Sequence, residues 1–287
     1  KKKSNKSPEI EFYNETFYKL QQDTLGKLKL PTFKQLRKQL KKRKKQIGDF
    51  EKHLFVIDFK GDLKATGVTR LRKEIDLILS IAQPNDQILL RLNSPGGTVT
   101  GYGLVSSQIQ RIRDANIPLT IAIDQVAASG GYMIASLANE IISAPYACIG
   151  SIGVVYEAPN FNEFLAKKGI NYNQVTAGKY KRTMSMLGEN TPEGESKMKE
   201  DLEMTHNLFQ NHVTQYRDLD LDKVATGETW PAIVAHKKGL VDRIYTSDAF
   251  IQDHLETHAI LIVKTKEDKS LLKAFKQKSH ALLQHVG

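Results

Sequence analysis

The chain has 287 residues, of which 40% are hydrophobic, and this is enough for one large α/β domain with extensions or for two small domains. The net charge of +10 comes from residues 1–50, which hold 15 basic and 5 acidic side chains, whereas residues 51–287 hold 27 of each sign. The single cysteine, Cys148, excludes an internal disulfide framework and a cysteine-rich zinc site, and its apolar surroundings predict a buried thiol. No run reaches the roughly 18 apolar residues that a membrane-spanning helix needs.

Residues 1–50 are predicted to form a basic helical extension. Phe33, Leu36 and Leu40 have helical spacing, and residues 41–45 are all positively charged. Contact with nucleic acid is disfavoured, because no aromatic residue interrupts the basic run and the rest of the chain has no basic patch. Attraction to anionic lipid and a solvated helix beside a membrane remain as alternatives. Because the sequence starts without a methionine, we expect a juxtamembrane segment that follows an N-terminal membrane helix.

Strand-like and helix-like segments alternate from residue 53 onward. Apolar runs predict strands over residues 53–59, 87–92, 118–124, 140–144 and 152–156. Helical spacing predicts helices over residues 67–82, 102–115, 133–138, 161–168, 192–217 and 230–238, and a basic helix after residue 265. Such alternation implies parallel strands joined by right-handed crossovers. We therefore predict one α/β domain over residues 51–265, with helical extensions over 1–50 and 266–287.

Ser129 stands between the predicted strand 118–124 and the helix-like run 133–138, in the sequence VAASGGY. A serine at a strand-to-helix turn exposes its hydroxyl, and the free amides at a helix start favour developing negative charge. Its small neighbours let a substrate backbone come close. The pattern is typical of a catalytic nucleophile, and a serine that only caps a helix is the alternative.

A second turn, NSPGG at residues 93–97, follows the predicted strand 87–92. In parallel sheets such strand ends face the ligand crevice. Glycine tolerates conformations that turn a backbone N–H outward, so one amide of this turn and the Gly130 amide would form an oxyanion hole. An ordinary tight turn is the alternative.

The histidines do not provide a base for Ser129, because none lies between residues 54 and 205. They are His53, His206, His212, His236, His254, His258, His280 and His285. His206 and His212 fall on a charged amphipathic helix, where we expect solvated or partner-facing roles. The positions of the histidines along the chain also argue against a zinc site. We expect no cofactor. A lysine can act as the base when its surroundings lower its pKa. Lys179 and Lys181 are the candidates, and the sequence around them does not separate the two.

Four motifs occur in a fixed order: NSPGG at 93–97, AASGGY at 127–132, GSIGV at 150–154 and GKYK at 178–181. Together they resemble the bacterial signal-peptide-peptidase (SppA/SohB) family of Ser–Lys serine proteases, over about residues 53–250. The resemblance implies a ClpP/crotonase-like fold, built from repeated β-β-α and βαβ units with helical extensions at both ends.

The resemblance also implies a role for five residues. Ser129 matches the nucleophile, Lys181 the general base, Ser151 the accessory serine that orients the lysine, and Gly97 and Gly130 the oxyanion donors. In this fold the Ser and Lys of one site commonly come from adjacent protomers or tandem domains. Because this chain has one copy of each motif, we expect a homo-oligomer in which Lys181 acts in trans.

The resulting expectation is a membrane-associated serine endopeptidase of the bacterial inner membrane, without a cofactor, that cleaves signal-peptide remnants or other short or membrane peptides. The basic N-terminal segment favours a catalytic domain on the cytoplasmic side. One alternative is a crotonase-type acyl-CoA enzyme, which shares the fold and needs no serine nucleophile. The other is a catalytically idle membrane scaffold that keeps the fold for oligomerisation.

Overall fold

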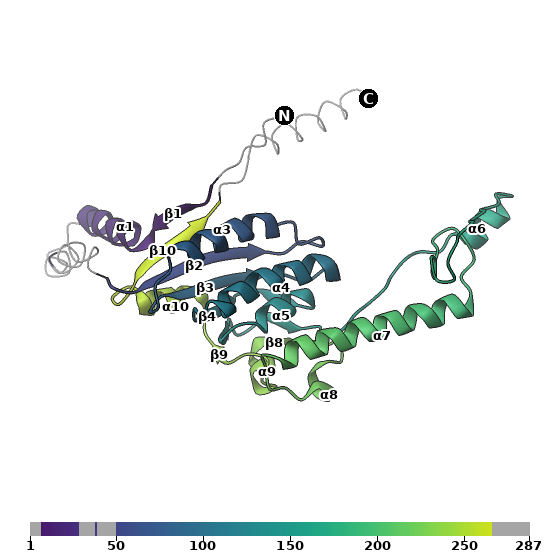
Figure 1. Cartoon of the computed structure of the whole chain (residues 1–287). Coiled ribbons are helices and arrows are strands. Elements are labelled where there is room, and N and C mark those ends of the chain that lie inside the picture. Colours follow the sequence, from purple (N-terminus) through teal and green to yellow (C-terminus); the bar gives the residue numbers. More distant parts are fainter. Residues whose placement is uncertain (1–6, 29–37, 39–49, 266–287) are drawn as a thin grey trace, which may run out of the picture.

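The computed structural model describes residues 7–28, 38 and 50–265 (Figure 1). Its strands are β1 (Glu9–Phe12), β2 (His53–Lys60), β3 (Gln87–Asn93), β4 (Leu119–Ile123), β5 (Val126–Ala128), β6 (Glu140–Ser143), β7 (Cys148–Gly150), β8 (Thr229–Pro231), β9 (Arg243–Ile244) and β10 (Ala259–Lys264). Its helices are α1 (Tyr13–Leu28), α3 (Val68–Ile81), α4 (Val99–Asp114), α5 (Gly130–Ala135), α6 (Asn162–Lys167), α7 (Pro192–Thr214), α8 (Leu221–Val224), α9 (Ala232–Lys237) and α10 (Ser247–His254).

A seven-stranded sheet forms the centre of the molecule, in the order β1-β10-β2-β3-β4-β6-β9. Strand β1 is antiparallel to β10, and every other neighbouring pair is parallel. The parallel strands are connected through α3, α4 and α5, which confirms the predicted α/β class and its βαβ units.

Both faces of this sheet are buried, so its strands are continuous apolar runs. On β2, Phe55, Ile57 and Phe59 belong to the larger core cluster, which also includes buried residues of α3, α4 and α5. The alternate residues Leu54 and Val56 belong to a second cluster on the opposite face, which α10 and α1 cover. This alternation is the expected consequence of side chains pointing to opposite faces of a strand.

A smaller sheet, β5-β7-β8, lies at one end of the main sheet. Strands β5 and β7 are parallel, and β8 runs antiparallel to β7. A single bridge between Ser94 and Ala127 joins the end of β3 to β5. The small sheet therefore continues directly from the main sheet at the point where the predicted nucleophile lies.

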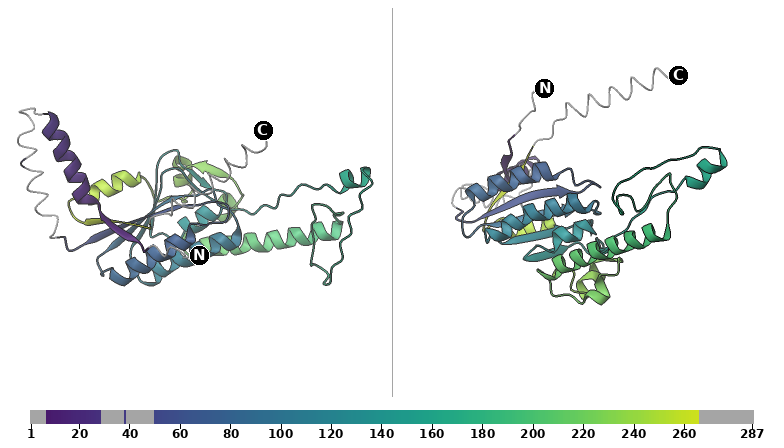
Figure 2. Two further views of the ribbon diagram at one scale, coloured as in Figure 1. Left: turned by 90° about the horizontal axis from the view of Figure 1, so that it is seen from above. Right: turned by 45° about the vertical axis from the view of Figure 1, so that its right-hand side comes forward.

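Residues 156–200 leave the body of the molecule as an arm, which includes α6 and the first part of α7 (Figures 1 and 2). Helix α7 begins as its sequence predicts, because the Thr191 hydroxyl accepts a hydrogen bond from the Gly194 amide and Pro192 occupies the first turn. Only its second half is anchored in the core, through the buried residues Phe209 and Val213. The N-terminal half of α7 thus holds the tip of the arm away from the sheet.

The predicted strand 152–156 is wrong. The strand of this region is β7, which ends at Gly150, and the chain then turns sharply because Gly150 and Ser151 both have positive φ, of 118° and 53°. The residues that follow lead out into the arm, and Val155 is 75% exposed. This apolar run therefore ends at the surface and does not form a buried strand. Cys148, at the start of β7, carries a free thiol that is half-buried rather than fully buried.

The predicted helix 230–238 begins later than expected, because residues 229–231 pair with β7 as strand β8. Helix α9 starts only at Ala232 and ends at Lys237. The tertiary pairing with β7 outweighs the local helical spacing here.

Residues 9–28 fall in the segment that we predicted to be an extension, and they pack on the domain. Strand β1 forms the edge of the main sheet, and Tyr13 and Phe17 of α1 pack on the second core cluster. The helical spacing of Phe33, Leu36 and Leu40 and the basic tail after 265 lie outside the described residues. Among the helices that are described, none is both long enough and apolar enough to cross a membrane.

Candidate active site

Three of the four sequence motifs meet where the two sheets join. The Ser94 amide donates to the Val126 carbonyl (2.8 Å), and the Ala128 amide donates back to the Ser94 carbonyl (3.0 Å). On the other side of β5, the register pairs Ala128 with Gly150. The ends of β3, β5 and β7 therefore lie side by side, and the segments that follow them line the same groove, with residues 95–98 after β3, Ser129 after β5 and Ser151 after β7.

Ser129 occupies a strained turn between β5 and α5. Its φ of 51° and ψ of −122° are uncommon for a residue with a side chain, and such strain persists only where surrounding contacts enforce it. The Ser129 amide donates to the Gly150 carbonyl (2.8 Å), which holds the turn against β7. Its side chain accepts no hydrogen bond from the helix amides, so the helix-capping alternative receives no support.

The backbone amides of Gly97 and Gly130 lie beside Ser129 and have no hydrogen-bond acceptor among the described residues. Gly96 lies directly against Ser129, since a Cβ added to Gly96 would be 2.8 Å from the Ser129 Cβ and 3.0 Å from the Gly130 nitrogen. A Cβ on Gly97 would overlap the Leu63 carbonyl. The NSPGG segment is therefore more than an ordinary surface turn, because its glycines allow it to approach the serine closely.

Ser151 is a neighbour of Ser129, because the two serines follow residues that are paired across β5 and β7. Ser151 also has a positive φ, and its amide donates to the Glu228 carbonyl (2.6 Å). Both serines line the same groove. The structure thus brings together Ser129, Ser151, Gly97 and Gly130.

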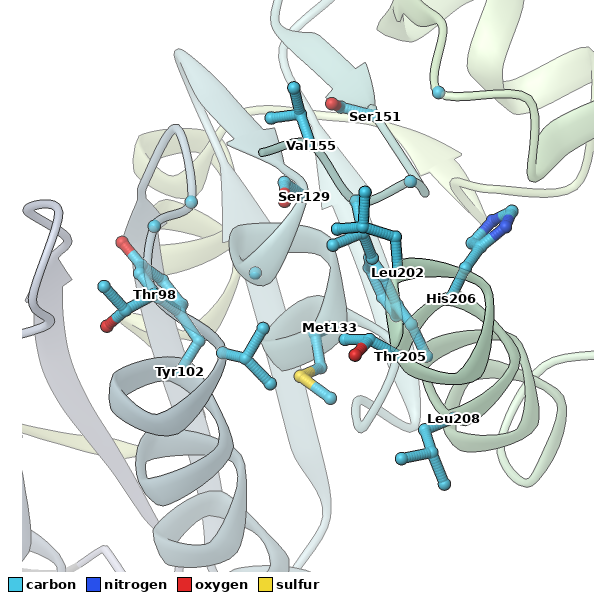
Figure 3. A pocket seen from close by; sticks show the side chains of 18 of the residues that line it. Thr98, Tyr102, Ser129, Met133, Ser151, Val155, Leu202, Thr205, His206 and Leu208 are labelled. Atoms are coloured by element: carbon cyan, nitrogen blue, oxygen red, sulfur yellow. The ribbon is translucent and has the colours of Figure 1, made fainter. Parts of the chain in front are cut away.

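The groove has a volume of about 1120 Å³. One wall is formed by the turn after β3 and by Tyr102 of α4, the other by Leu202, Thr205 and His206 of α7, with Met133 between them (Figure 3). Most of the side chains along the whole groove are apolar, so an extended peptide with apolar side chains fits it.

Lys181 does not line this groove. It lies in the arm, in a turn closed by a hydrogen bond from its own amide to the Gly178 carbonyl (3.1 Å), and its side chain is exposed. Its ammonium forms no ion pair with any residue that the structure describes. A single copy of the chain therefore does not bring Lys181 to Ser129.

Lys179, two residues before, has a different environment. Its ammonium lies 2.9 Å from a Glu193 carboxylate oxygen and 5.0 Å from the centre of the Tyr180 ring. The hydrogen bond to Glu193, and then that to Tyr180, raise the pKa of Lys179 above its usual value. A lysine held in its charged form is a poor base, so these contacts favour Lys181 over Lys179 where the sequence left both open.

His206 and His212 both form hydrogen bonds to the body of the molecule, which their position on a charged amphipathic helix did not predict. The His212 Nε2 donates to the Met133 carbonyl (2.9 Å), and burial lowers the pKa of His212. The His206 Nε2 donates to the Ile152 carbonyl (3.2 Å) at the edge of the groove. Both histidines therefore connect α7 to the body of the molecule, and His206 also lines the groove.

The sequence interpretation missed the whole contribution of α7 to the groove. Leu202, Thr205, His206 and Phe209 recur with helical spacing, which indicates that they share a face but not what that face contacts. Within the described residues, no three or more His, Cys, Asp or Glu side chains are grouped so that they could hold a metal ion.

Comparison with protein-family models gives two adjacent matches. The model described as peptidase family S49 matches residues 111–260, and its N-terminal companion, described as peptidase family S49 N-terminal, matches residues 7–109. The two matches cover nearly all of the main sheet, apart from most of β10, and the segments that form the groove.

Curated relatives are similar over the same region. The "Probable protease SohB" of Haemophilus influenzae is 48% identical over 223 residues, which are 77% of this chain and 63% of that protein. The "Putative protease SohB" of Buchnera aphidicola subsp. Baizongia pistaciae is 50% identical over 222 residues, 77% of this chain and 64% of that protein. "Protease 4" of Salmonella typhi is 31% identical over 160 residues, 55% of this chain and 26% of that protein. The chain thus spans a little under two thirds of the length of the first two relatives.

Proposed function

Because this chain belongs to peptidase family S49, we propose that it is the catalytic part of a serine endopeptidase with Ser129 as its nucleophile. The family and the ClpP/crotonase-like fold agree with the resemblance that the four motifs predicted. The observation that carries the proposal is the strained Ser129 turn in a mostly apolar groove. Beside it lie the Gly97 and Gly130 amides, which have no acceptor among the residues that the structure describes. The crotonase-type alternative finds no support in the family match.

The chemistry follows from the arrangement of these groups. The Ser129 hydroxyl attacks a peptide carbonyl while a neutral lysine removes its proton. The negative oxygen of the tetrahedral intermediate is stabilised by the Gly97 and Gly130 amides, each worth about 3 kcal/mol of barrier. The protonated lysine then gives its proton to the leaving amine, and water hydrolyses the acyl-enzyme. To Ser151, which lines the same groove, we assign the role of accepting a hydrogen bond from the lysine and orienting it.

We assign the general base to Lys181 of a second copy of the chain. Within one copy the exposed arm carries Lys181 away from Ser129, so the site is incomplete without a partner. The arm exposes a set of large apolar side chains, which isolated soluble surfaces rarely do. They are Phe161, Phe164, Ile170, Tyr172, Val175, Tyr180 and Met186. Packing of this surface on a neighbouring copy would also remove the amine from water, which favours its neutral form.

The substrates that fit this groove are extended peptides with apolar side chains, and we propose signal-peptide remnants and other short or membrane peptides. Membrane association and a location at the bacterial inner membrane, with the catalytic domain facing the cytoplasm, rest on the basic N-terminal segment alone. Fractionation of the full-length protein from cells tests that part of the proposal. Recovery of the protein in the soluble fraction would contradict it.

The central experiment compares hydrolysis of a fluorogenic peptide library by the wild type, Ser129→Ala and Lys181→Ala. We expect activity only in the wild type. Co-expression of the two variants should restore about a quarter of the wild-type rate, because random pairing of two kinds of subunit creates one intact site in four. A mixture that stays inactive would exclude Lys181 in trans, and activity in Ser129→Ala would exclude the nucleophile. An inactive wild type would leave the scaffold alternative.

A further inference from the structure

A buried chain of hydrogen bonds lies beneath the candidate oxyanion hole. The Ser94 Oγ is 2.6 Å from the Tyr102 hydroxyl, and it accepts a hydrogen bond from the Gly96 amide (3.2 Å). The Tyr102 hydroxyl is 3.1 Å from the Asp62 carbonyl. Both side chains are enclosed, with Ser94 0% and Tyr102 1% exposed. The groove chemistry described above uses neither hydroxyl.

The number of hydrogens in this chain of bonds fixes its direction. The Asp62 carbonyl can only accept, so the single hydrogen of the Tyr102 hydroxyl is donated to it. Ser94 must then donate its own hydrogen to the Tyr102 oxygen, which leaves a Ser94 lone pair for the Gly96 amide. Burial raises the pKa of Tyr102 above its usual value, so the phenol keeps the proton that this order requires.

The same tyrosine supports the other half of the oxyanion hole. A Cβ added to Gly130 would overlap the ring of Tyr102, so the ring lies directly under the Gly130 backbone. A Cβ added to Gly61 would overlap both the Ser94 Oγ and the Tyr102 hydroxyl, so the Gly61 backbone lies directly against the two hydroxyls. Tyr102 therefore contacts the Gly130 backbone with its ring and, through Ser94, holds the Gly96 amide.

We propose that Ser94 and Tyr102 are positioning residues that fix the Gly96–Gly97 turn and the Gly130 backbone relative to each other. An oxyanion hole works only when its donors are preorganised at the distance that the tetrahedral oxygen requires. Ser94 and the Tyr102 hydroxyl act through the backbone, while the Tyr102 ring also forms part of the groove wall. This inference rests on the proposed function, because it concerns the efficiency of the same oxyanion hole.

The test uses Tyr102→Phe and Ser94→Ala in the full chain, with Tyr132→Phe as a matched control. Tyr132 is also a buried tyrosine, whose hydroxyl donates to the Leu240 carbonyl (3.0 Å) and contacts Arg217, and it does not line the groove. We expect kcat to fall about tenfold in both test variants with KM changed less than about twofold, because a loosened oxyanion hole weakens the transition state and not the bound substrate. The double variant should lose no more kcat than the less active of the two single variants, because both substitutions break the same chain of hydrogen bonds. Tyr132→Phe should keep kcat.

A second measurement does not depend on activity. Hydrogen–deuterium exchange of peptides that cover residues 94–98 should become about tenfold faster in Tyr102→Phe and Ser94→Ala, and stay unchanged in Tyr132→Phe. If Ser94→Ala fails to fold, Tyr102→Phe carries the test, because it removes a single oxygen. Unchanged exchange at residues 94–98, or an equal loss of kcat in Tyr132→Phe, would overturn the inference. An inactive wild type, or an active Ser129→Ala variant, would overturn the proposed function instead, while the exchange result would still decide whether these side chains fix the turn.

Discussion

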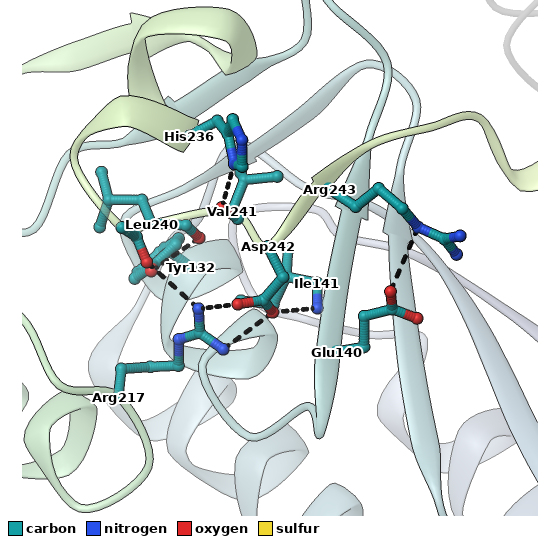
Figure 4. Close-up of polar contacts among 10 residues, drawn as sticks. Tyr132, Glu140, Ile141, Arg217, His236, Leu240, Val241, Asp242 and Arg243 are labelled. Carbon is teal, nitrogen blue, oxygen red and sulfur yellow. Dashed lines mark hydrogen bonds and ion pairs between the residues drawn. The ribbon is translucent and has the colours of Figure 1, made fainter.

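Arg217 and Asp242 form a two-pronged ion pair that joins the end of α7 to the sheet (Figure 4). The Arg217 Nη1 and Nη2 lie 2.9 Å and 2.6 Å from the two carboxylate oxygens of Asp242. Asp242 also accepts a hydrogen bond from the Ile141 amide (2.7 Å), and Arg217 donates to the Gly239 carbonyl (3.1 Å). Both side chains of this ion pair thus also bond to the backbone. The pair therefore fixes the C-terminal end of α7, the helix that carries the arm.

We predict that Asp242→Asn lowers the free energy of unfolding by about 2 kcal/mol. The substitution removes the negative charge opposite Arg217 and one of the two hydrogen bonds that join these partly buried side chains. The control is Glu140→Gln, which breaks the pair between Glu140 and Arg243 (3.2 Å), where both side chains are at least one third exposed. Exposed pairs contribute little, so the control should change the urea midpoint much less. Equal shifts in the two variants would show that Asp242 has no special role.

Gly130→Ala should abolish activity and also destabilise the protein, because the added Cβ would overlap the Tyr102 ring and force the α5 backbone away from it. Gly103→Ala is the control, since a Cβ at Gly103 in α4 meets nothing within 4 Å. Alanine is the better helix former, so this control should gain about 0.5–1 kcal/mol of stability and keep its activity. Peptide hydrolysis and thermal unfolding of both variants check the prediction.

Lys179→Ala and Glu193→Gln should each keep activity within several-fold of the wild type, whereas Lys181→Ala should lose it. The reason is that Lys179 is paired with Glu193 and held in its charged form, which suits a contact that shapes the arm but not a general base. Peptide hydrolysis by the three variants at several pH values is the measurement. Loss of activity in Lys179→Ala together with retention in Lys181→Ala would exchange the roles of the two lysines.

His258 should make the folded protein sensitive to mild acid. Its Nε2 is buried without a partner, and burial, together with the positive charge of His254 and Lys52, lowers the pKa of His258 to about 4. Above pH 6.5 the side chain is neutral in both the folded and the unfolded state. Below pH 6.5 only the unfolded state takes up the proton, so stability falls until about pH 4, by roughly 2–3 kcal/mol.

The variant His258→Phe keeps a ring in this position and cannot titrate. We expect its urea midpoint to change less between pH 7.5 and pH 5 than that of the wild type. Asp86, whose carboxylate is 2.8 Å from the His53 Nδ1, is the nearby group that opposes the effect. The same pH dependence in both proteins would show that other groups cause the acid sensitivity.

Asn14→Ala should detach α1 from the domain. The buried Asn14 amide donates to the Leu255 carbonyl (3.1 Å) and the His258 carbonyl (3.0 Å), and its oxygen accepts from the Ile260 amide (2.7 Å). Loss of three buried hydrogen bonds should cost about 3 kcal/mol and expose residues 9–28 to limited proteolysis. Thr16→Ala, on the exposed face of the same helix, is the control and should remain resistant.

The sequence by itself determined the alternation of strands and helices and the turn that carries Ser129, the candidate nucleophile. Buried parallel strands such as β2 and β3 are continuous apolar runs, because both of their faces are covered, and a local pattern is enough to find them. The NSPGG and VAASGGY turns were recognisable for a similar reason, since their glycines lie so close to neighbouring atoms that a Cβ would overlap them.

Only the tertiary structure decided how these segments meet. The pairing of β5 with β7 puts Ser151 beside Ser129, and the pairing of β8 with β7 converts the start of a predicted helix into a strand. The position of Lys181 outside its own groove and the wall that α7 adds to that groove depend on where a helix of 23 residues lies against the body. These features come from contacts between residues far apart in the chain, and local spacing carries no information on which distant partner a segment will find.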